Sequence, residues 1–139
     1  YRLRLSQVGY RTEKIEKVRR NNMLTAMPVK MNKENPPLTT VFGKAKWFAF
    51  VDDGGSVEIR ENPYAGAGPK TVAWLIGLGV DTIVTQHIGG NPFMVMKEAG
   101  VRLFYPGEGR ILVGQVLEKL KHGSMEEITV DNIMRFAHH

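Results

Sequence analysis

The chain has 139 residues and contains no cysteine. This absence excludes disulfides, thiolate nucleophiles, cysteine-ligated zinc and a protein-ligated iron–sulfur cluster of the usual kind. A metal centre would have to depend on histidine, carboxylate, methionine or backbone ligands. The sequence also has no apolar run that approaches the roughly 18 residues of a membrane-spanning helix. We therefore expect a cytoplasmic protein that does not work in a membrane.

The sequence also lacks the motifs of a catalytic site. It contains no Gly-x-Ser-x-Gly turn for a nucleophilic serine, and Ser6, Ser56 and Ser124 have no base near them in the sequence. Asp52 and Asp53 fit a hairpin turn better than a catalytic pair. Because nothing assembles an acid–base or metal-hydrolase site, we predict that the protein is not an enzyme.

Positive charge is concentrated in the first 22 residues. The formal net charge is +5, and residues 1–22 hold seven Lys or Arg against two Glu, which accounts for all of it. Residues 23–139 hold twelve side chains of each sign. Since this longer part has no basic excess for a phosphate backbone, we predict no nucleic-acid partner.

Met23 fits the start of the folded part, because a strand-like run follows it directly. Three interpretations of residues 1–22 stay open: a basic arm for nucleic acid or membrane, a helical or disordered appendage, and non-native sequence read from upstream DNA. The third rests on Val18-Arg19-Arg20, since the codons GTG-AGG-AGG resemble a ribosome-binding site. We predict one domain over 23–136, with residues 1–22 outside the fold.

The apolar pattern predicts an α/β fold. The C-terminal half repeats a helix, a glycine stop, a valine-led strand and a Gly-bearing turn, which is typical of βαβ units with parallel strands. A hairpin in the N-terminal half adds antiparallel strands, so we expect a mixed sheet of about five strands with helices on both faces. The expected strands are 24–30, 46–51, 56–61, 80–85 and 101–105, and the expected helices are 69–78, 93–99 and 111–121. Residues 126–139 stay unassigned, and we assign no function to His138 and His139.

Three Gly-bearing loops should meet where the parallel strands end, because open α/β sheets bind ligands there. They are Phe42-Gly43-Lys44, Gly66-Ala67-Gly68-Pro69-Lys70-Thr71 and His87-Ile88-Gly89-Gly90-Asn91-Pro92. Free N–H groups at a helix start favour anions, and glycine lets a ligand approach the backbone. Plain turns would use the same residues, with Asn91 as N-cap and Pro92 as the first helical residue.

His87 follows the expected strand 80–85 and is the candidate metal ligand. It could ligate a metal or donate a hydrogen bond to an anion, but a lone histidine is more often structural. Met96 has the helical spacing of a core residue, and Met94 falls off that face. His122 fits a solvated charge at a helix C-terminus.

Four segments, in this order and spacing, resemble the dinitrogenase iron–molybdenum cofactor biosynthesis domain of the NifX, NafY and NifB C-terminal type. They are Met27-Pro28-Val29, Val41-Phe42-Gly43-Lys44-Ala45-Lys46-Trp47-Phe48, Ala73-Trp74-Leu75…Gly79-Val80-Asp81, and Ile88-Gly89-Gly90-Asn91-Pro92-Phe93…Gly100-Val101. The resemblance covers most of residues 23–121.

The resemblance implies a ribonuclease H-like fold without nuclease activity. It also implies a monomer or weak dimer that carries an iron–sulfur or iron–molybdenum–sulfur cluster, or its precursor, from a donor protein to an acceptor protein. The implied cofactor-binding residues are Phe42, Gly43, Gly66, Gly68, His87, Gly89, Gly90 and Asn91, with His87 as the metal ligand.

One departure from the family concerns Val41. Many members carry a histidine directly before the Phe-Gly pair, and this chain has Val41 there. A single candidate ligand then indicates weak or non-covalent cluster binding, or a different cofactor. The alternative function is an anion- or nucleotide-binding regulatory module without catalysis.

Overall fold

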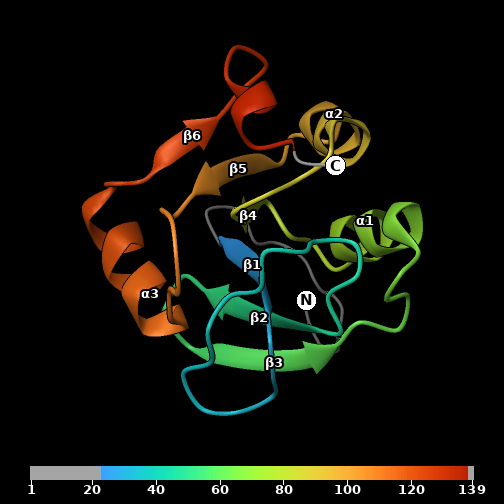
Figure 1. The fold of residues 1–139 in the computed structure, drawn as a ribbon. Coiled ribbons are helices and arrows are strands. Elements are labelled where there is room, and N and C mark those ends of the chain that lie inside the picture. Colours follow the sequence, from blue (N-terminus) through green and yellow to red (C-terminus); the bar gives the residue numbers. More distant parts are fainter. Residues whose placement is uncertain (1–22, 138–139) are drawn as a thin grey trace, which may run out of the picture.

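Six strands form one mixed sheet in the order β3-β2-β1-β4-β5-β6 (Figure 1). The structure is a computed structural model that describes residues 23–137. The predictions for residues 1–22 and for His138 and His139 therefore lie outside the described residues. The strands are β1 Leu24–Val29, β2 Trp47–Asp52, β3 Val57–Glu61, β4 Thr82–Val84, β5 Arg102–Tyr105 and β6 Glu126–Ile128.

The strand pairing confirms the mixed sheet and corrects its size. β2 pairs antiparallel with β1 and β3, and β4 runs parallel to both β1 and β5. β6 pairs antiparallel with β5, so the sheet has six strands rather than about five. The extra strand comes from the segment that the pattern left unassigned. This strand has three residues, of which only Ile128 is buried. Three residues are too few to show the alternation of apolar and polar side chains that marks a strand in a sequence.

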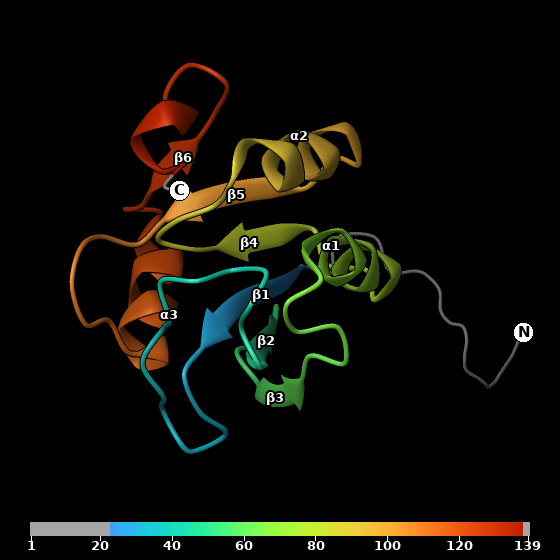
Figure 2. The ribbon, with the colours of Figure 1, turned by 45° about the vertical axis from the view of Figure 1, so that its right-hand side comes forward.

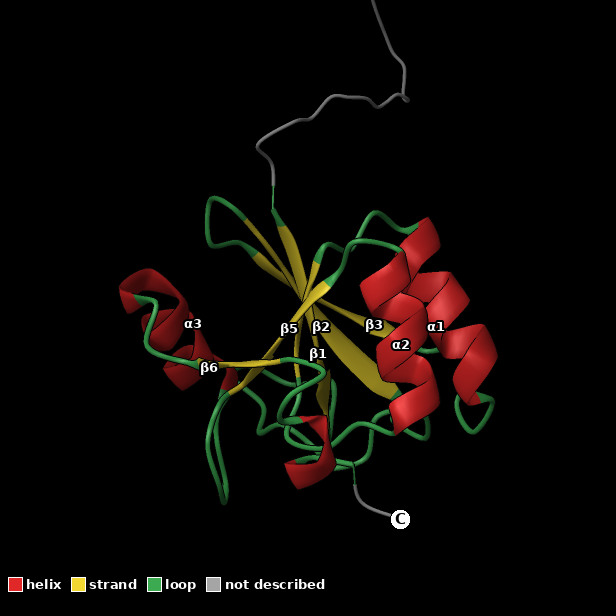
Figure 3. Ribbon diagram, turned by 90° about the horizontal axis from the view of Figure 1, so that it is seen from above, coloured by secondary structure: helices red, strands yellow, loops and turns green. Residues whose placement is uncertain are grey.

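Helices cover both faces of the sheet, as expected. α1 (Gly68–Gly77) and α2 (Gly90–Glu98) lie on one face, and α3 (Val113–His122) lies on the other (Figure 2, Figure 3). A short 3-10 helix, Ile133–Arg135, follows β6. In residues 23–137, no helix has the length and apolar character needed to cross a membrane.

The predicted glycine stops are confirmed. Gly79 and Gly100 follow α1 and α2 with φ of 88° and 84°, and Gly123 caps α3 with φ of 60°. These left-handed conformations suit glycine, which has no Cβ to clash. Each helix therefore ends where the sequence indicates, within one or two residues.

Two apolar cores lie on the two faces of the central strands. Side chains alternate along a strand, so neighbouring residues enter different cores. The core beneath α1 and α2 includes Ala26, Phe48, Phe50, Ile83 and Phe93. The core beneath α3 includes Met27, Ala49, Val51, Val84 and Val116. The strand β2 is therefore covered on both faces.

The β2–β3 hairpin accounts for Asp52. Its Oδ1 accepts hydrogen bonds from the N–H groups of Gly54 and Ser56, at 3.0 and 2.9 Å. β3 follows as the edge strand, and most of its residues are exposed. The structure therefore places Asp52 in a turn, as predicted.

Candidate functional site

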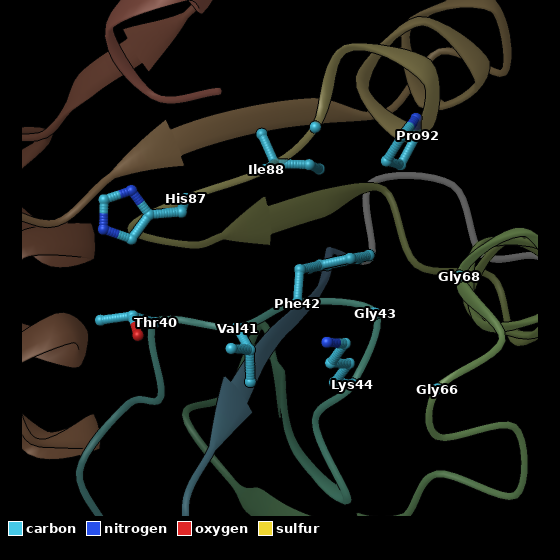
Figure 4. Close-up of a pocket in the computed structure, with 11 residues that line it drawn as sticks. Thr40, Val41, Phe42, Gly43, Lys44, Gly66, Gly68, His87, Ile88 and Pro92 are labelled. Atoms are coloured by element: carbon cyan, nitrogen blue, oxygen red, sulfur yellow. The ribbon is translucent and has the colours of Figure 1, made fainter. Parts of the chain in front are cut away.

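A cavity of about 520 Å³ lies beyond the carboxyl ends of β1 and β4, where α1 and α2 begin (Figure 4). Three segments far apart in the sequence form its wall: 40–44, 66–68 and 87–92. Its lining residues are Thr40, Val41, Phe42, Gly43, Lys44, Gly66, Gly68, His87, Ile88, Gly89 and Pro92. The geometry therefore brings together the three loops that the sequence singles out.

Six of the eight candidate binding residues line this cavity. They are Phe42, Gly43, Gly66, Gly68, His87 and Gly89. Gly90 and Asn91 do not line it, although they lie in the first turn of α2 together with the lining residue Pro92. The binding role of all eight residues stays a prediction.

Two of the glycines are needed by the fold itself. A Cβ on Gly43 would lie 3.1 Å from the Cα of Gly68, so a side chain there would push the two loops apart. The N–H of Gly66 donates to the carbonyl oxygen of Gly43 at 2.9 Å, and Gly66 has φ of 90°. Close backbone packing and a left-handed conformation therefore explain Gly43 and Gly66 without a ligand.

The other two lining glycines have no such requirement. A Cβ on Gly68 would have no neighbour within 4 Å, and one on Gly89 would make an ordinary 3.6 Å contact with Pro92. Neither residue has a positive φ. The fold therefore does not require glycine at Gly68 or Gly89, and both residues leave open space at the cavity.

Both helices begin at the cavity without a side-chain cap. α1 starts at Gly68, and Gly89 is the N-cap of α2; neither helix has a side-chain hydrogen bond at its N-terminus. The first amides of a helix have no acceptor within the helix and lie at the positive end of its dipole. The two helix starts therefore favour an anion in the cavity.

This geometry corrects the prediction that Asn91 is the N-cap and Pro92 the first helical residue. Gly89 is the N-cap, with φ of −70° and ψ of 160°, so Asn91 and Pro92 are the second and third helical residues. Glycine is itself an accepted N-cap residue. The helix therefore begins two residues earlier than the side-chain preference of asparagine indicates.

A buried polar group holds the loop that leads to α1. The Nδ2 of Asn62 donates to the carbonyl oxygen of Ala45 and to the Oγ1 of Thr71, at 3.0 and 2.9 Å. Thr71 in turn donates to the carbonyl oxygen of Tyr64 at 3.2 Å. Asn62 is only 3% exposed. These bonds tie the 62–68 loop to the chain just after Gly43, and no sequence motif indicates them.

Lys44 is a lining residue that the predicted set omits. It is the one Lys or Arg among the residues that line this cavity, and none of the ion pairs in residues 23–137 includes it. Its position in the sequence indicates the site, since Lys44 directly follows the predicted binding residues Phe42 and Gly43. Val41, which is 43% exposed, also lines the cavity, so the departure from the family pattern falls at the site itself.

His87 is half-buried and lies at the opposite end of the cavity from Gly66 and Gly68 (Figure 4). Its carbonyl oxygen accepts a hydrogen bond from the Oγ1 of Thr85 at 2.9 Å, which holds the backbone after β4. Among residues 23–137, no three His, Asp or Glu side chains come together to hold a metal ion. The described part of the chain therefore offers no metal centre built from three or more such side chains.

The C-terminal segment supports the site loop. The N–H of Ile88 donates to the carbonyl oxygen of Phe136 at 3.0 Å. The ring of Phe136 also packs on Tyr105, with the ring centroids 4.6 Å apart. Residues 126–137, which the pattern left unassigned, thus fix the backbone beside His87.

The hydroxyl of Tyr105 should lose its proton at an unusually high pH. Burial, and then its hydrogen bond to Glu108, raise the pKa of Tyr105 from 10.0 to about 12. A raised pKa stabilises the folded protein below pH 10, and this contribution is lost as the pH rises through about 12. The tyrosinate absorbance of the protein minus that of Tyr105→Phe should therefore show a midpoint near 12. Glu108→Gln should lower this midpoint, and a midpoint near 10 with the circular dichroism unchanged would contradict the assignment.

Comparisons with known proteins agree with this fold. The uncharacterized protein MJ0580 of Methanocaldococcus jannaschii is 26% identical over 90 residues, which cover 59% of this chain and 73% of that protein. A candidate NifB protein from Thermotoga, with a structure determined by NMR, is 28% identical with a TM-score of 0.66, over 78% of this chain and 95% of that one. The apo form of the orange protein of Desulfovibrio gigas shares the fold, with 21% identity and a TM-score of 0.68, over 77% of this chain and 93% of that one.

A family match spans every segment that forms the cavity. Residues 23–123 match the family described as dinitrogenase iron-molybdenum cofactor. Segments 40–44, 66–68 and 87–92 all lie within this range. The match covers well over half of the chain and confirms the resemblance seen in the sequence. The protein belongs to the dinitrogenase iron-molybdenum cofactor family.

Proposed function

We propose that the cavity binds an iron–sulfur or iron–molybdenum–sulfur cluster, or a precursor of one, as cargo. The protein would receive it from a donor protein and deliver it to an acceptor, without catalysing a reaction. One observation supports this most strongly: two uncapped helix starts, Lys44 and His87 surround an open cavity in a member of this family. A ribonuclease H-like classification and a cytoplasmic location belong to the same proposal.

The residues present fit a cluster that arrives already assembled. Such a cluster is an anion, which the helix starts and Lys44 would attract. The chain has no cysteine, and the described residues contain no group of three metal-ligating side chains. Binding would therefore depend on N–H groups, on charge and on at most one imidazole nitrogen. Weak attachment of this kind suits a carrier, because the cargo must leave again.

Anaerobic cluster uptake tests the proposal. The purified protein is mixed with a preassembled cluster and desalted, and visible absorbance and metal content are measured. We expect a coloured complex, and we expect His87→Ala to retain less cluster than the unsubstituted protein. His122→Ala is the matched control, because His122 is exposed on α3 and pairs with Glu118 at 3.8 Å. If no cluster is retained, or if the two histidine variants retain it equally, this site assignment is wrong.

The same helix starts and Lys44 would also suit a nucleotide or another phosphate-bearing anion. This alternative predicts regulation by that ligand rather than transport of a cluster. A ligand at a hundredfold excess over its Kd raises the free energy of unfolding by about 2.7 kcal/mol, which a thermal-shift screen detects. A nucleotide that stabilises the protein this strongly, together with failed cluster uptake, would favour the alternative.

A further inference from the structure

A second, smaller cavity adjoins the first and is not used by the proposed cargo. Its volume is about 220 Å³, which corresponds to several water-sized groups at about 30 Å³ each. Thr40 and His87 line both cavities, so they form a shared wall. A small ion fits this space.

Two cations line the smaller cavity, and neither pairs with a carboxylate of the described residues. They are Lys30, directly after β1, and Arg110, in the loop after β5. None of the ion pairs in residues 23–137 involves either of them. Glu108 also lines the cavity and accepts a hydrogen bond from the hydroxyl of Tyr105. Lys30, Arg110 and Glu108 together carry one net positive charge, which favours an anion.

Gln86 contributes a buried acceptor to this wall. Its Nε2 donates to the carbonyl oxygens of Gly107 and Gly109, at 2.9 and 2.8 Å, and so holds the loop that carries Arg110. Flipping the amide would place Oε1 against these two carbonyl oxygens, so the orientation is fixed. Gln86 is 3% exposed, and its Oε1 accepts no hydrogen bond from any described residue. A buried oxygen without a donor is unfavourable, and a ligand hydroxyl would satisfy it.

We propose that the smaller cavity binds a free, small oxyanion that carries a hydroxyl, of the hydrogen phosphate class. Lys30 and Arg110 hold its charged oxygens, and arginine matches such oxygens with two parallel N–H groups. Its hydroxyl donates to the buried Oε1 of Gln86. Sulfate, which has no proton at neutral pH, leaves the Oε1 of Gln86 without a donor and binds more weakly.

Calorimetric titration of the full chain with inorganic phosphate, and separately with sulfate, tests this site. We expect phosphate to bind at least about tenfold more tightly than sulfate, because an unsatisfied buried acceptor costs that much. Arg110→Met and Lys30→Met should each weaken phosphate binding by about tenfold, since each removes a charged hydrogen bond. Lys33→Met is the matched control, because Lys33 is exposed and outside the cavity lining. It should leave phosphate binding unchanged.

Three results would overturn the proposal. The first is no phosphate binding, and the second is equal binding of phosphate and sulfate. The third is loss of phosphate binding in Lys44→Met while the Lys30 and Arg110 variants still bind, which would place the ion in the larger cavity. Cluster uptake is measured in the same Lys30 and Arg110 variants. Because neither residue lines the larger cavity, the two proposals fail separately.

Discussion

A Gly68→Leu variant should fold normally and lose cluster uptake. Gly68 lines the larger cavity, and a Cβ there would have no neighbour within 4 Å, so the protein itself accommodates a side chain. A rigid cargo that needs the open space would meet the new side chain instead. We expect uptake to fall by about tenfold or more, since 1.4 kcal/mol of lost contact suffices for a factor of ten.

Gly77→Leu is the matched control for this variant. Gly77 is the last residue of the same helix, and a Cβ on it would also have no neighbour within 4 Å. It does not line the larger cavity. Cluster uptake and the melting temperature are measured for both variants. If Gly68→Leu takes up as much cluster as Gly77→Leu, the cargo does not occupy the cavity.

Phe48→Ala should cause the largest loss of stability among these variants. Phe48 is fully buried, and its ring meets Phe42 and Trp74 edge-on, with centroids 5.5 and 6.0 Å away. Removing a buried phenylalanine costs about 3–5 kcal/mol, because apolar contact is lost and a cavity remains. This is a large part of the 5–15 kcal/mol that typically stabilises a domain. Chemical denaturation should show it as a lower midpoint.

Val57→Ala is the control for this measurement. Val57 lies on the edge strand β3 and is 42% exposed, so we expect its free energy of unfolding to change by no more than about 0.5 kcal/mol. Phe42 lines the larger cavity and packs on Phe48, so Phe48→Ala should also loosen the site. A loss below about 1 kcal/mol for Phe48→Ala would show that this core is not packed as described.

Local sequence signals were sufficient for most of the elements. Glycine stops mark the ends of the helices, and the Asp52–Gly55 turn marks the hairpin. The alternation in 46–51 predicts a strand buried on both faces, and Phe48 and Ala49 enter opposite cores. These predictions succeed because each depends on backbone preference or side-chain period within a few residues.

Features that depend on contacts between residues far apart in the chain could not be predicted from the sequence. β6 exists because β5 offers it a pairing edge, although Ile128 is its only buried residue. Asn91 has the chemistry of an N-cap, but the extended backbone of Gly89 starts the helix earlier. The support of Ile88 by Phe136 joins residues 48 positions apart, and no local pattern reports such a bond.

The sequence by itself determined the α/β class, the glycine stops, the absence of a cysteine-ligated metal site and the family. These follow from composition, periodicity and motif order. Only the tertiary structure decided which glycines serve the fold, Gly43 and Gly66, and which leave open space, Gly68 and Gly89. It also placed Lys44 and His87 at one cavity and put Lys30, Arg110 and Gln86 around a second. The physical reason is that a cavity is formed by segments far apart in the chain, and their distances are set by packing of the whole sheet.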